Sequence, residues 1–376
     1  MEYKCKNCGG PLRFDPKIDK LKCDFCGNTY DLSEYEDHLH TGHDHDHAHD
    51  HDAHHTQTEN PGFDAQQNQY VKAMDDSTDE QKDLTAFECP HCGAEVVTDK
   101  NTAATTCVFC GTPMVIQESV QGKFRPDKVI PFEVDKKQIE KLYEDYIRTK
   151  PFYPDAYSKA NVISKIKAVY LPFWLYDAKM NGSILATGER TFSFRTGQWI
   201  VTNHEVYDLY RQGSMHFEKI PVIASSKTPV DAMDSIEPYD YSKLVDYNPG
   251  YLPGFLATRY DQSAEQKAEK MKGRALDTLQ SSLAGTIRGV EGFRVLDAKG
   301  GAESLQSHYA LLPAYLLFMD YDHDEDKLIA INGQTGKIVG NVPVDNKKKN
   351  RYFLKMFLIF LAVFILIGMA ILVAVD

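Results

Sequence analysis

The chain has 376 residues and a formal net charge of −12 at pH 7. This acidic balance argues against a general polyanion binder, because proteins that bind nucleic acid usually carry a basic stripe that neutralises phosphates. The length allows two or three domains.

All eight cysteines fall into two quartets of identical spacing, C-x2-C-x14-C-x2-C, and the second quartet follows the first by 84 positions. The quartets are Cys5, Cys8, Cys23 and Cys26, and Cys89, Cys92, Cys107 and Cys110. Two residues between paired thiolates place both sulfurs on one side of a tight turn, and a second pair completes a tetrahedron around Zn²⁺. Since four thiolates leave no open coordination position, we predict two structural zinc ions, each held in a zinc ribbon.

A glycine directly follows each C-x2-C pair, which predicts a left-handed backbone turn around the metal. These glycines are Gly9, Gly27, Gly93 and Gly111. Disulfides in an oxidising compartment are the alternative to zinc. The first residues, MEYKCKNCGG, contain no apolar h-region, so we expect no signal peptide and a reducing environment for the cysteines.

The two predicted ribbons cover residues 1–32 and 85–120 and carry weak charges of opposite sign. Lys and Arg exceed Asp and Glu by 2 in residues 1–30, whereas the acids are in excess by 2 in residues 87–116. Neither charge gives the electrostatic footprint that DNA requires. We therefore expect the ribbons to dock proteins, and we do not expect nucleic acid as a partner.

Residues 33–84 form a linker between the ribbons, and its first part reads HLHTGHDHDHAHDHDAHH over residues 38–55. So few apolar side chains cannot offset the entropy cost of ordering the segment, which predicts disorder. His-rich tracts can bind metal ions loosely. The candidate ligands of such a weak tract are His43, His45, His47, His49 and His51. A polar spacer without any metal is the alternative.

Residues 121–345 have the mixed periodicity of a globular body. Asp135-x-x-Gln138 is a variant capping box, and the apolar spacing after it predicts a helix that ends before Pro151. A second helix is expected over residues 263–284, where small residues on one stripe predict close packing on a sheet. The strand-like runs are 166–177, 183–187, 190–195, 199–210, 309–321, 327–331 and 337–342. Because these strands cluster instead of alternating with helices, we predict a mainly antiparallel α+β body.

Three Leu-Pro steps followed by aromatic residues recur in the body, over residues 171–174, 252–255 and 312–315. Proline is expected at strand starts, edges or bulges. An exposed aromatic rim is one interpretation of these steps. A buried aromatic core is favoured, because large aromatic side chains are mostly buried.

The sequence shows no constellation typical of a catalytic site, and we expect a protein that is not an enzyme. The segment Asn332-Gly333-Gln334-Thr335-Gly336-Lys337 superficially resembles a phosphate loop, but it lacks the G-x-x-x-x-G-K-[ST] spacing. We predict a hairpin turn at this segment.

The end of the sequence predicts a membrane anchor. Residues 356–375 contain no charge. A helix of this length, 20 residues, can span a bilayer. A buried core helix is the alternative, but such helices are rarely apolar on every face. Residues 346–355 are basic, so the positive-inside rule places the N-terminal bulk in the cytoplasm of a single-pass, tail-anchored protein of the cell membrane.

Several segments together resemble a known family. They are residues 87–94 and 102–107 of the second ribbon, 124–132, 169–174 and 332–337. They are similar to bacterial membrane-anchored proteins labelled as TFIIB-type zinc-ribbon proteins. The resemblance implies that the chain acts with a flotillin-like SPFH protein and a PspA-type membrane-stress protein.

The fold class predicted from the sequence is therefore α+β, with two N-terminal zinc ribbons of four cysteines each, the antiparallel body and one C-terminal transmembrane helix. The predicted function is a non-enzymatic adaptor that docks proteins at the membrane. Two alternatives are a membrane-tethered regulator that binds nucleic acid and a metal sensor that uses the His-rich linker.

Overall fold

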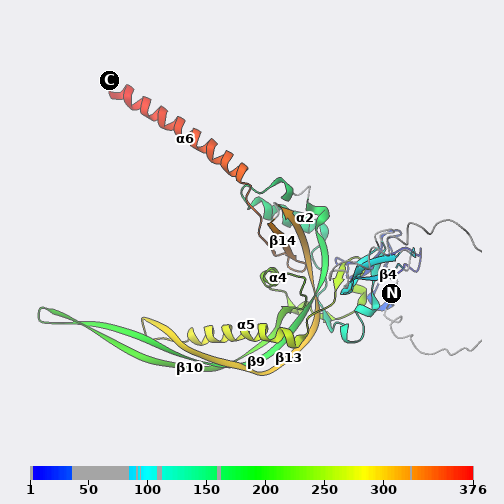
Figure 1. Cartoon of the computed structure of the whole chain (residues 1–376), viewed down its shortest axis with the longest axis horizontal. Helices are drawn as coiled ribbons and strands as arrows, with labels where there is room; N and C mark the ends of the chain where they lie inside the picture. The colour runs from blue at the N-terminus through cyan, green and yellow to red at the C-terminus, as the bar shows by residue number, and fades with distance from the viewer. Residues whose placement is uncertain are drawn as a thin grey trace, which may run out of the picture. The chain divides into compact units, whose positions relative to one another are not determined.

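The computed structural model of the chain describes residues 3–35, 84–89, 92–93, 95–107, 112–158, 162–321 and 324–375. The chain divides into two compact units (Figure 1). Unit 1 comprises Met1–Arg125 and Asn248–Arg259, and unit 2 comprises Pro126–Tyr247 and Tyr260–Asp376.

Unit 1 contains two small β modules, one around each group of cysteines. The first module is an antiparallel sheet in the order β1-β2-β3, followed by the 3₁₀ turn η1. Its elements are β1 (Leu12–Asp15), β2 (Lys20–Cys23), β3 (Thr29–Tyr30) and η1 (Leu32–Tyr35). Strand β1 alternates buried and half-buried residues, so that Leu12 and Phe14 lie in the core of the module.

The second module repeats only part of this arrangement, because its strands lie in two separate sheets. A hairpin of β4 and β5 precedes a sheet in the order β12-β6-β7. These strands are β4 (Leu84–Glu88), β5 (Glu95–Asp99), β6 (Thr102–Thr106), β7 (Pro113–Val115) and β12 (Leu256–Thr258). The pair Leu21↔Tyr30 of the first module corresponds to Thr105↔Met114, shifted by the same 84 residues as the cysteines. For the β2-β3 pair and the β6-β7 pair, the sequence repeat is therefore also a repeat of strand register.

The segment Asn248–Arg259 belongs to unit 1 although it lies far along the chain. The backbone amide of Phe14 donates to the carbonyl of Pro253 at 2.9 Å, and the Phe14 ring meets the Tyr251 ring edge-on at 5.0 Å. At the other end of the segment, the amide of Arg259 donates to the carbonyl of Asn101 at 2.7 Å. This segment thus contacts both modules.

Unit 2 is built on a sheet in the order β11-β8-β13-β9, with β10 added beside β9 and the β14-β15 hairpin beside β13. The short strands are β8 (Lys128–Val129), β11 (Val245–Asp246), β14 (Asp324–Asn332) and β15 (Ile338–Gly340). All neighbours are antiparallel except β8 and β13. The predicted α+β class with mostly antiparallel pairing is confirmed.

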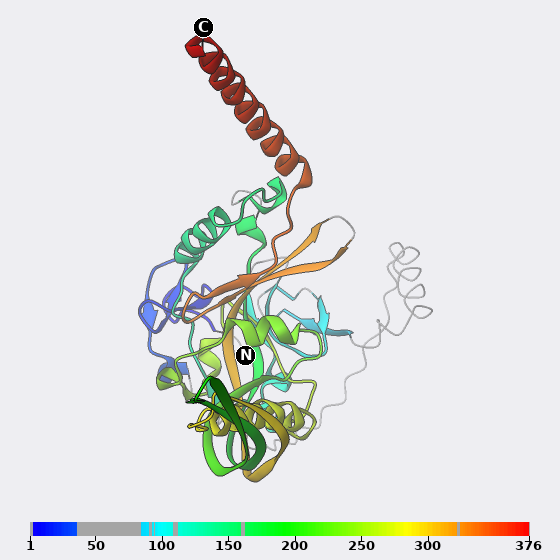
Figure 2. The ribbon, with the colours of Figure 1, turned by 90° about the vertical axis from the view of Figure 1, so that its left-hand side faces the viewer.

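Three strands of unit 2 are far longer than the sequence predicted. They are β9 (Lys167–Thr196), β10 (Trp199–Ile223) and β13 (Gly292–Tyr321). We call the part of these strands that extends from residue 177 to the β9-β10 turn, with its paired residues in β10 and β13, the arm. Figure 2 looks along the arm and shows the three strands twisting about one another. The separate short runs predicted within residues 166–210 are wrong, because they are parts of two continuous strands.

Helix α5 (Ala264–Ala284) lies along one face of the arm (Figure 1). It begins at the capping box of Ser263 and Gln266, and its buried stripe matches the small residues seen in the sequence. Met271, Ala275 and Leu279 pack against Met180 and other residues of β9. The predicted helix and its packing on a sheet are confirmed.

A row of three glycines lies beneath α5. Gly182 of β9 pairs with Gly213 of β10 on one side and with Gly300 of β13 on the other. A Cβ atom added at Gly182 would lie 2.9 Å from Leu279 Cδ2, which is closer than real Cβ contacts. The glycines therefore allow the helix to approach the strands closely.

Helix α2 (Lys136–Arg148) covers the other end of the unit 2 sheet. The predicted capping box is present, since Asp135 accepts from the amide of Gln138 at 2.9 Å. Ile147 and Tyr143 of this helix pack with Leu317 of β13. Within the described residues, the remaining short helical elements are η4 (Gln117–Ser119), η5 (Gly122–Phe124), η6 (Asp155–Tyr157), η7 (Ile163–Lys165), α4 (Val230–Ile236), η8 (Tyr241–Lys243) and η9 (Pro249–Tyr251).

Helix α6 (Asn346–Val375) continues through both the basic segment and the apolar segment. Asp345 caps it, because its carboxylate accepts from the amides of Lys347 at 2.8 Å and Lys348 at 3.1 Å. The Lys348 ammonium also donates to the carbonyl of Tyr153 and to the carboxylate of Asp155. The start of α6 is thereby attached to the body of unit 2.

Candidate metal centres

The first cysteine group brings four sulfur atoms together in unit 1. Cys5, Cys8, Cys23 and Cys26 offer sulfurs that all lie within 4.8 Å of one another. Two of the contacts are 3.5 Å long, from Cys5 to Cys26 and from Cys8 to Cys23. A tetrahedron of thiolates around a metal at 2.3 Å has edges of about 3.8 Å, whereas bonded sulfurs lie about 2.05 Å apart. The sulfur atoms therefore have the spacing of a metal site, and the seven described cysteines are free thiols.

The backbone around each pair of cysteines forms one kind of turn. The amide of Gly9 donates to the carbonyl of Cys5 at 2.8 Å, and the amide of Gly27 donates to that of Cys23 at 3.0 Å. Both glycines have positive φ, 70° and 75°. A side chain would strain this conformation, so glycine fixes the turn that aims both sulfurs at one point. The predicted left-handed glycines are confirmed at these two positions and at Gly93.

Hydrogen bonds favour the thiolate form of part of this group. Burial raises the pKa of Cys5, but donation by the Tyr30 hydroxyl and by the backbone amide of Cys8 outweighs it and lowers the pKa to about 6. A hydrogen bond from the backbone of Gly10 lowers the pKa of Cys8. Contacts with the sulfurs of Cys23, Cys26 and Cys5, together with burial, outweigh it and raise the pKa to about 12. Negative sulfurs this close repel one another, so a divalent cation is needed before all four can ionise. The residues present thus fit a bound metal ion.

The second cysteine group has the same design. Cys89, Cys92 and Cys107 offer sulfurs within 4.8 Å of one another, and the sulfurs of Cys92 and Cys107 are 3.8 Å apart. The amide of Gly93 donates to the carbonyl of Cys89 at 2.9 Å, as in the first group. The predicted fourth ligand, Cys110, lies outside the described residues.

The His-rich candidates also lie outside the described residues. They are His43, His45, His47, His49 and His51, and with them most of the predicted linker. Gly111, the fourth predicted turn glycine, is outside as well.

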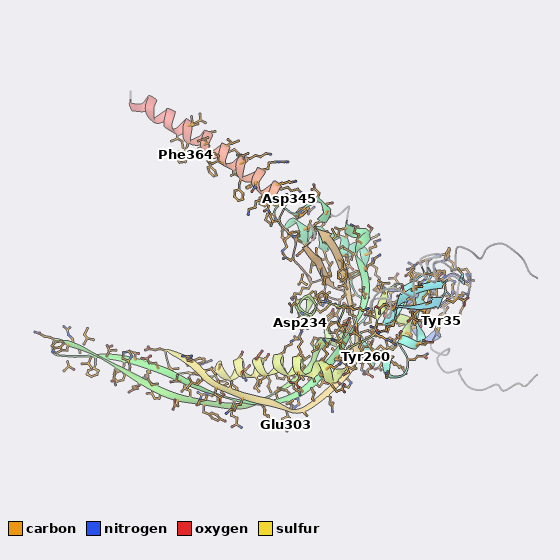
Figure 3. All side chains as sticks on the ribbon, viewed as in Figure 1. Tyr35, Asp234, Tyr260, Glu303, Asp345 and Phe364 are labelled. Carbon is orange, nitrogen blue, oxygen red and sulfur yellow. The ribbon has the colours of Figure 1, made fainter. Side chains whose placement is uncertain are left out.

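Sequence reasoning missed Tyr30, whose hydroxyl lies 3.0 Å from the sulfur of Cys5. The ring of Tyr30 also packs edge-on against Tyr35, which is labelled in Figure 3, at 5.9 Å. The repeat of 84 residues places Met114 at the corresponding position of the second module. Met114 is buried beside Cys89 and Cys107. Comparing the two copies position by position would have shown that only the first copy supplies a hydroxyl donor there.

The phosphate-loop alternative fails on geometry, because the segment 332–337 connects β14 to β15 as a hairpin turn. Asn332 is fully buried, and its side-chain oxygen accepts from the amides of Gln334 and Thr335 at 2.9 Å. The amide of its side chain donates to the carbonyl of Ile236 at 3.0 Å. These residues hold a turn together, as the sequence predicted.

Helix α6 is long and apolar enough to cross a membrane. Among the described residues, its candidate membrane span covers Asn346–Ile367, with a mean hydropathy of 1.9 and no buried part. Figure 3 shows Asp345 at the start of the helix and Phe364 projecting from it. An apolar helix with this exposure differs from the core helix of a soluble protein, whose apolar stripe is covered.

Comparison with known proteins gives one informative match. An uncharacterized protein, YdjG of Bacillus subtilis (strain 168), is 28% identical over 319 residues, which cover 72% of this chain and 93% of YdjG. No family model matches the chain, and no solved structure matches it. The similarity extends over nearly all of YdjG, whose description assigns no activity.

Proposed function

We propose that the chain is a non-enzymatic adaptor that α6 anchors in a bacterial cell membrane, with two zinc ribbons that dock partner proteins at the cytoplasmic face. The observation that carries the proposal is the exposure of α6. Its apolar side chains from Phe357 to Ile367 are all exposed by roughly half or more, among them Phe364 at 75%. A bilayer is the environment that would cover them on every face.

The basic residues at the start of α6 support the proposed orientation. They are Lys347, Lys348, Lys349, Arg351 and Lys355. Lys and Arg next to a membrane span favour the cytoplasmic side. Units 1 and 2 would then lie in the reducing cytosol, where cysteine groups of this spacing bind metal instead of forming disulfides.

Zinc is the proposed metal of both cysteine groups. Four sulfur ligands with tetrahedral spacing suit Zn²⁺, and a closed shell leaves no position for a reacting water. The ions would stabilise the two modules, whose cores are too small to fold well alone. In this proposal the ribbons are rigid surfaces without chemistry of their own.

Phe25 is the residue best placed to dock a partner. It lies between Cys23 and Cys26, and 77% of its surface is exposed. Metal ligation on both sides would hold the ring in place, so a partner could bind it without paying for its ordering. The second ribbon has Phe109 at the matching sequence position. The partners that the family resemblance favours are flotillin-like SPFH proteins and PspA-type proteins.

Co-purification from native membranes tests this proposal. The full chain is solubilised gently, treated with nuclease and captured, and its partners are identified by mass spectrometry. We expect SPFH or PspA-type proteins with the unaltered chain and a loss of about tenfold or more with Phe25→Ser, as for a binding hot spot. Ile18→Ser, at another exposed apolar residue of the same module, is the matched control. Partners that nuclease removes would instead favour the nucleic-acid regulator.

A further inference from the structure

The outer end of the arm is a two-stranded ribbon with an exposed apolar face. Strand β13 begins at Gly292, which pairs with Glu189, so that only β9 and β10 extend beyond this point. We call residues 190–205 the tip. Figure 1 shows this hairpin projecting past the end of α5.

The register places four large apolar side chains on one face of the tip. Phe194 pairs with Val201, and Trp199 and Phe192 follow two residues away on their own strands. Residues that pair directly, and residues two apart on a strand, share a face. The exposed fractions are 42% for Phe192, 50% for Phe194, 77% for Trp199 and 41% for Val201. The rings of Phe192 and Phe194 are stacked, with centroids 6.3 Å apart.

The opposite face of the tip is largely polar, and Ile200, which is 74% exposed, is its one large apolar residue. The hydroxyls of Ser193 and Thr202 hydrogen-bond at 2.9 Å, and Thr191 contacts the ring of His204 on the same face. The apolar face continues the side of β9 that α5 covers further along, since Ala186 is buried in the α5 cluster. The tip is therefore amphipathic, and its apolar side is exposed where the helix has ended.

The charge of the tip is opposite to that of the whole chain. Arg190 and Arg195 flank the two phenylalanines, and Glu205, which pairs with Arg190 across the hairpin, is the one acidic residue of the tip. The chain as a whole carries −12. Aromatic rings combined with arginine and hydroxyl side chains are typical of segments that lie at the surface of an anionic membrane.

We propose that the tip inserts its apolar face shallowly into the interface of a bilayer that contains anionic lipid. The arginines would contact lipid phosphates while the rings enter the boundary between headgroups and acyl chains. The inference rests on the proposed function, because anchoring by α6 keeps the tip near lipid and makes a small contact sufficient. A second copy of the chain fits less well, since its tip would bring the same positive charges.

Tryptophan fluorescence tests the proposal. The chain has two tryptophans, Trp174 and Trp199. The full chain with Trp174→Phe is reconstituted into vesicles of phosphatidylcholine and phosphatidylglycerol whose acyl chains are brominated. Bromine quenches only nearby indoles. We expect about twofold quenching of Trp199, as for a residue at the interface.

Two further tryptophan positions, each in a Trp174→Phe/Trp199→Phe background, separate the possible results. Val206→Trp reports from the same arm, about 23 Å from position 199 at the rise of a strand, and we expect no quenching there. Phe364→Trp reports from α6, and we expect strong quenching. If the indole at position 199 is quenched no more than the one at position 206, while the one in α6 is quenched, the tip proposal is wrong and the anchor stands. If the indole in α6 is not quenched either, the anchor is wrong and the tip proposal falls with it.

The lipid charge gives a second readout. Arg190→Gln with Arg195→Gln, or vesicles of phosphatidylcholine alone, should reduce the quenching of Trp199 by about half, since each charge contributes to binding an anionic surface. The quenching of the indole that Phe364→Trp places in α6 should not change. Undiminished quenching of Trp199 in both cases would overturn the requirement for anionic lipid.

Discussion

Single glycines decide how closely α5 approaches the arm. A Cβ atom at Gly300 would lie 2.6 Å from the carbonyl oxygen of Asn181 and 2.5 Å from a methyl group of Leu276. The next residue, Gly301, has nothing within 4 Å of that position. Neighbouring residues of one strand therefore face very different surroundings.

We expect Gly300→Val to reduce the free energy of unfolding of unit 2 by about 3 kcal/mol, the upper end of overpacking, because backbone atoms cannot move aside easily. Gly301→Val is the matched control and should change it by less than about 0.5 kcal/mol. Urea unfolding of the detergent-solubilised chain, followed by fluorescence of Trp174 in a Trp199→Phe background, measures both. Equal effects of the two substitutions would refute the close packing of α5.

A half-buried ion pair attaches α5 to the segment after α4. Arg274 donates to both carboxylate oxygens of Glu237, at 2.8 and 3.4 Å, and to the carbonyl of Pro221 at 2.8 Å. Burial raises the pKa of Glu237 above its ordinary value, and the contacts with Arg274 oppose this rise. A carboxyl whose pKa is higher in the folded state costs stability as the pH rises through that pKa.

Removing the arginine should therefore destabilise the protein more at neutral than at acidic pH. Without its partner, the pKa of Glu237 rises further, so the folded state is penalised increasingly as the carboxyl ionises above its unfolded pKa. We expect Arg274→Met to lower the free energy of unfolding by about 2 kcal/mol at pH 7, and by clearly less at pH 4. Arg148→Met, which removes an exposed pair with Glu144, should have little effect at either pH. A loss that is equal at both pH values would contradict this explanation.

At the scale of elements, capping residues and periodicity predicted the helices well. The capping box predicted at Asp135 begins α2. Helix α5 begins after Ser263, near the predicted start, through a capping box with Gln266 that was not predicted. The interpretation of the Leu-Pro steps as aromatic core also agrees with the structure at Phe173 and Tyr315, which are buried. Local hydrogen bonds and apolar spacing determine these features, so the sequence alone contains the signal.

The long strands could not be predicted in the same way. Glycines such as Gly182 and Gly188 interrupt the alternation of β9, and the short run predicted over residues 183–187 lies between these two glycines. In the folded chain Gly182 makes room for Leu279 of α5, a residue almost a hundred positions further along the sequence. Pro172 was expected at a strand start, an edge or a bulge. It lies inside β9, and its carbonyl accepts from the amide of Ala224 at 2.9 Å. Tertiary packing decides these positions.

The two cysteine groups could be located from their spacing, but their surroundings could not. The contact of Tyr30 with Cys5 depends on the fold of β3. The pairing of Phe14 with the segment after Tyr247 depends on contacts between distant parts of unit 1. Spacing specifies ligands, whereas hydrogen-bond donors around them come from the assembled module.

Measuring the metal content tests whether each cysteine module is a zinc ribbon. The purified chain should contain two zinc ions per molecule, and Cys89→Ser or Cys5→Ser should each remove one, because three thiolates bind far less tightly than four. Each substitution should unfold its own module and leave unit 2 folded, which the fluorescence of Trp174 reports. Ser193→Ala, far from both groups in the sequence, is the control. Zinc near zero in the unaltered chain under reducing conditions would show that the cysteines serve another purpose.

At the scale of the whole molecule, the proposal assigns α6 the role of holding everything else at the membrane. Confinement raises the effective concentration of the ribbons for partners that also lie there, so modest contacts are sufficient. The same confinement would keep the tip of the arm close to lipid. In this proposal units 1 and 2 present docking surfaces and carry out no chemistry. The cysteine groups agree with this role, because their arrangement favours structural metal.

The most direct test of the proposed membrane anchor follows where the chain and its partners are found after α6 is shortened. Cells that express either the full chain or the chain without residues 356–376 are fractionated, and the proteins captured with each form are quantified in membrane and soluble fractions. We predict that the full chain and its captured SPFH or PspA-type proteins are found together in the membrane fraction. The shortened chain should be found in the soluble fraction and capture far less partner, because it no longer shares the membrane with those proteins. A shortened chain that stays with the membrane, or a full chain that captures none of these proteins, would contradict this proposal.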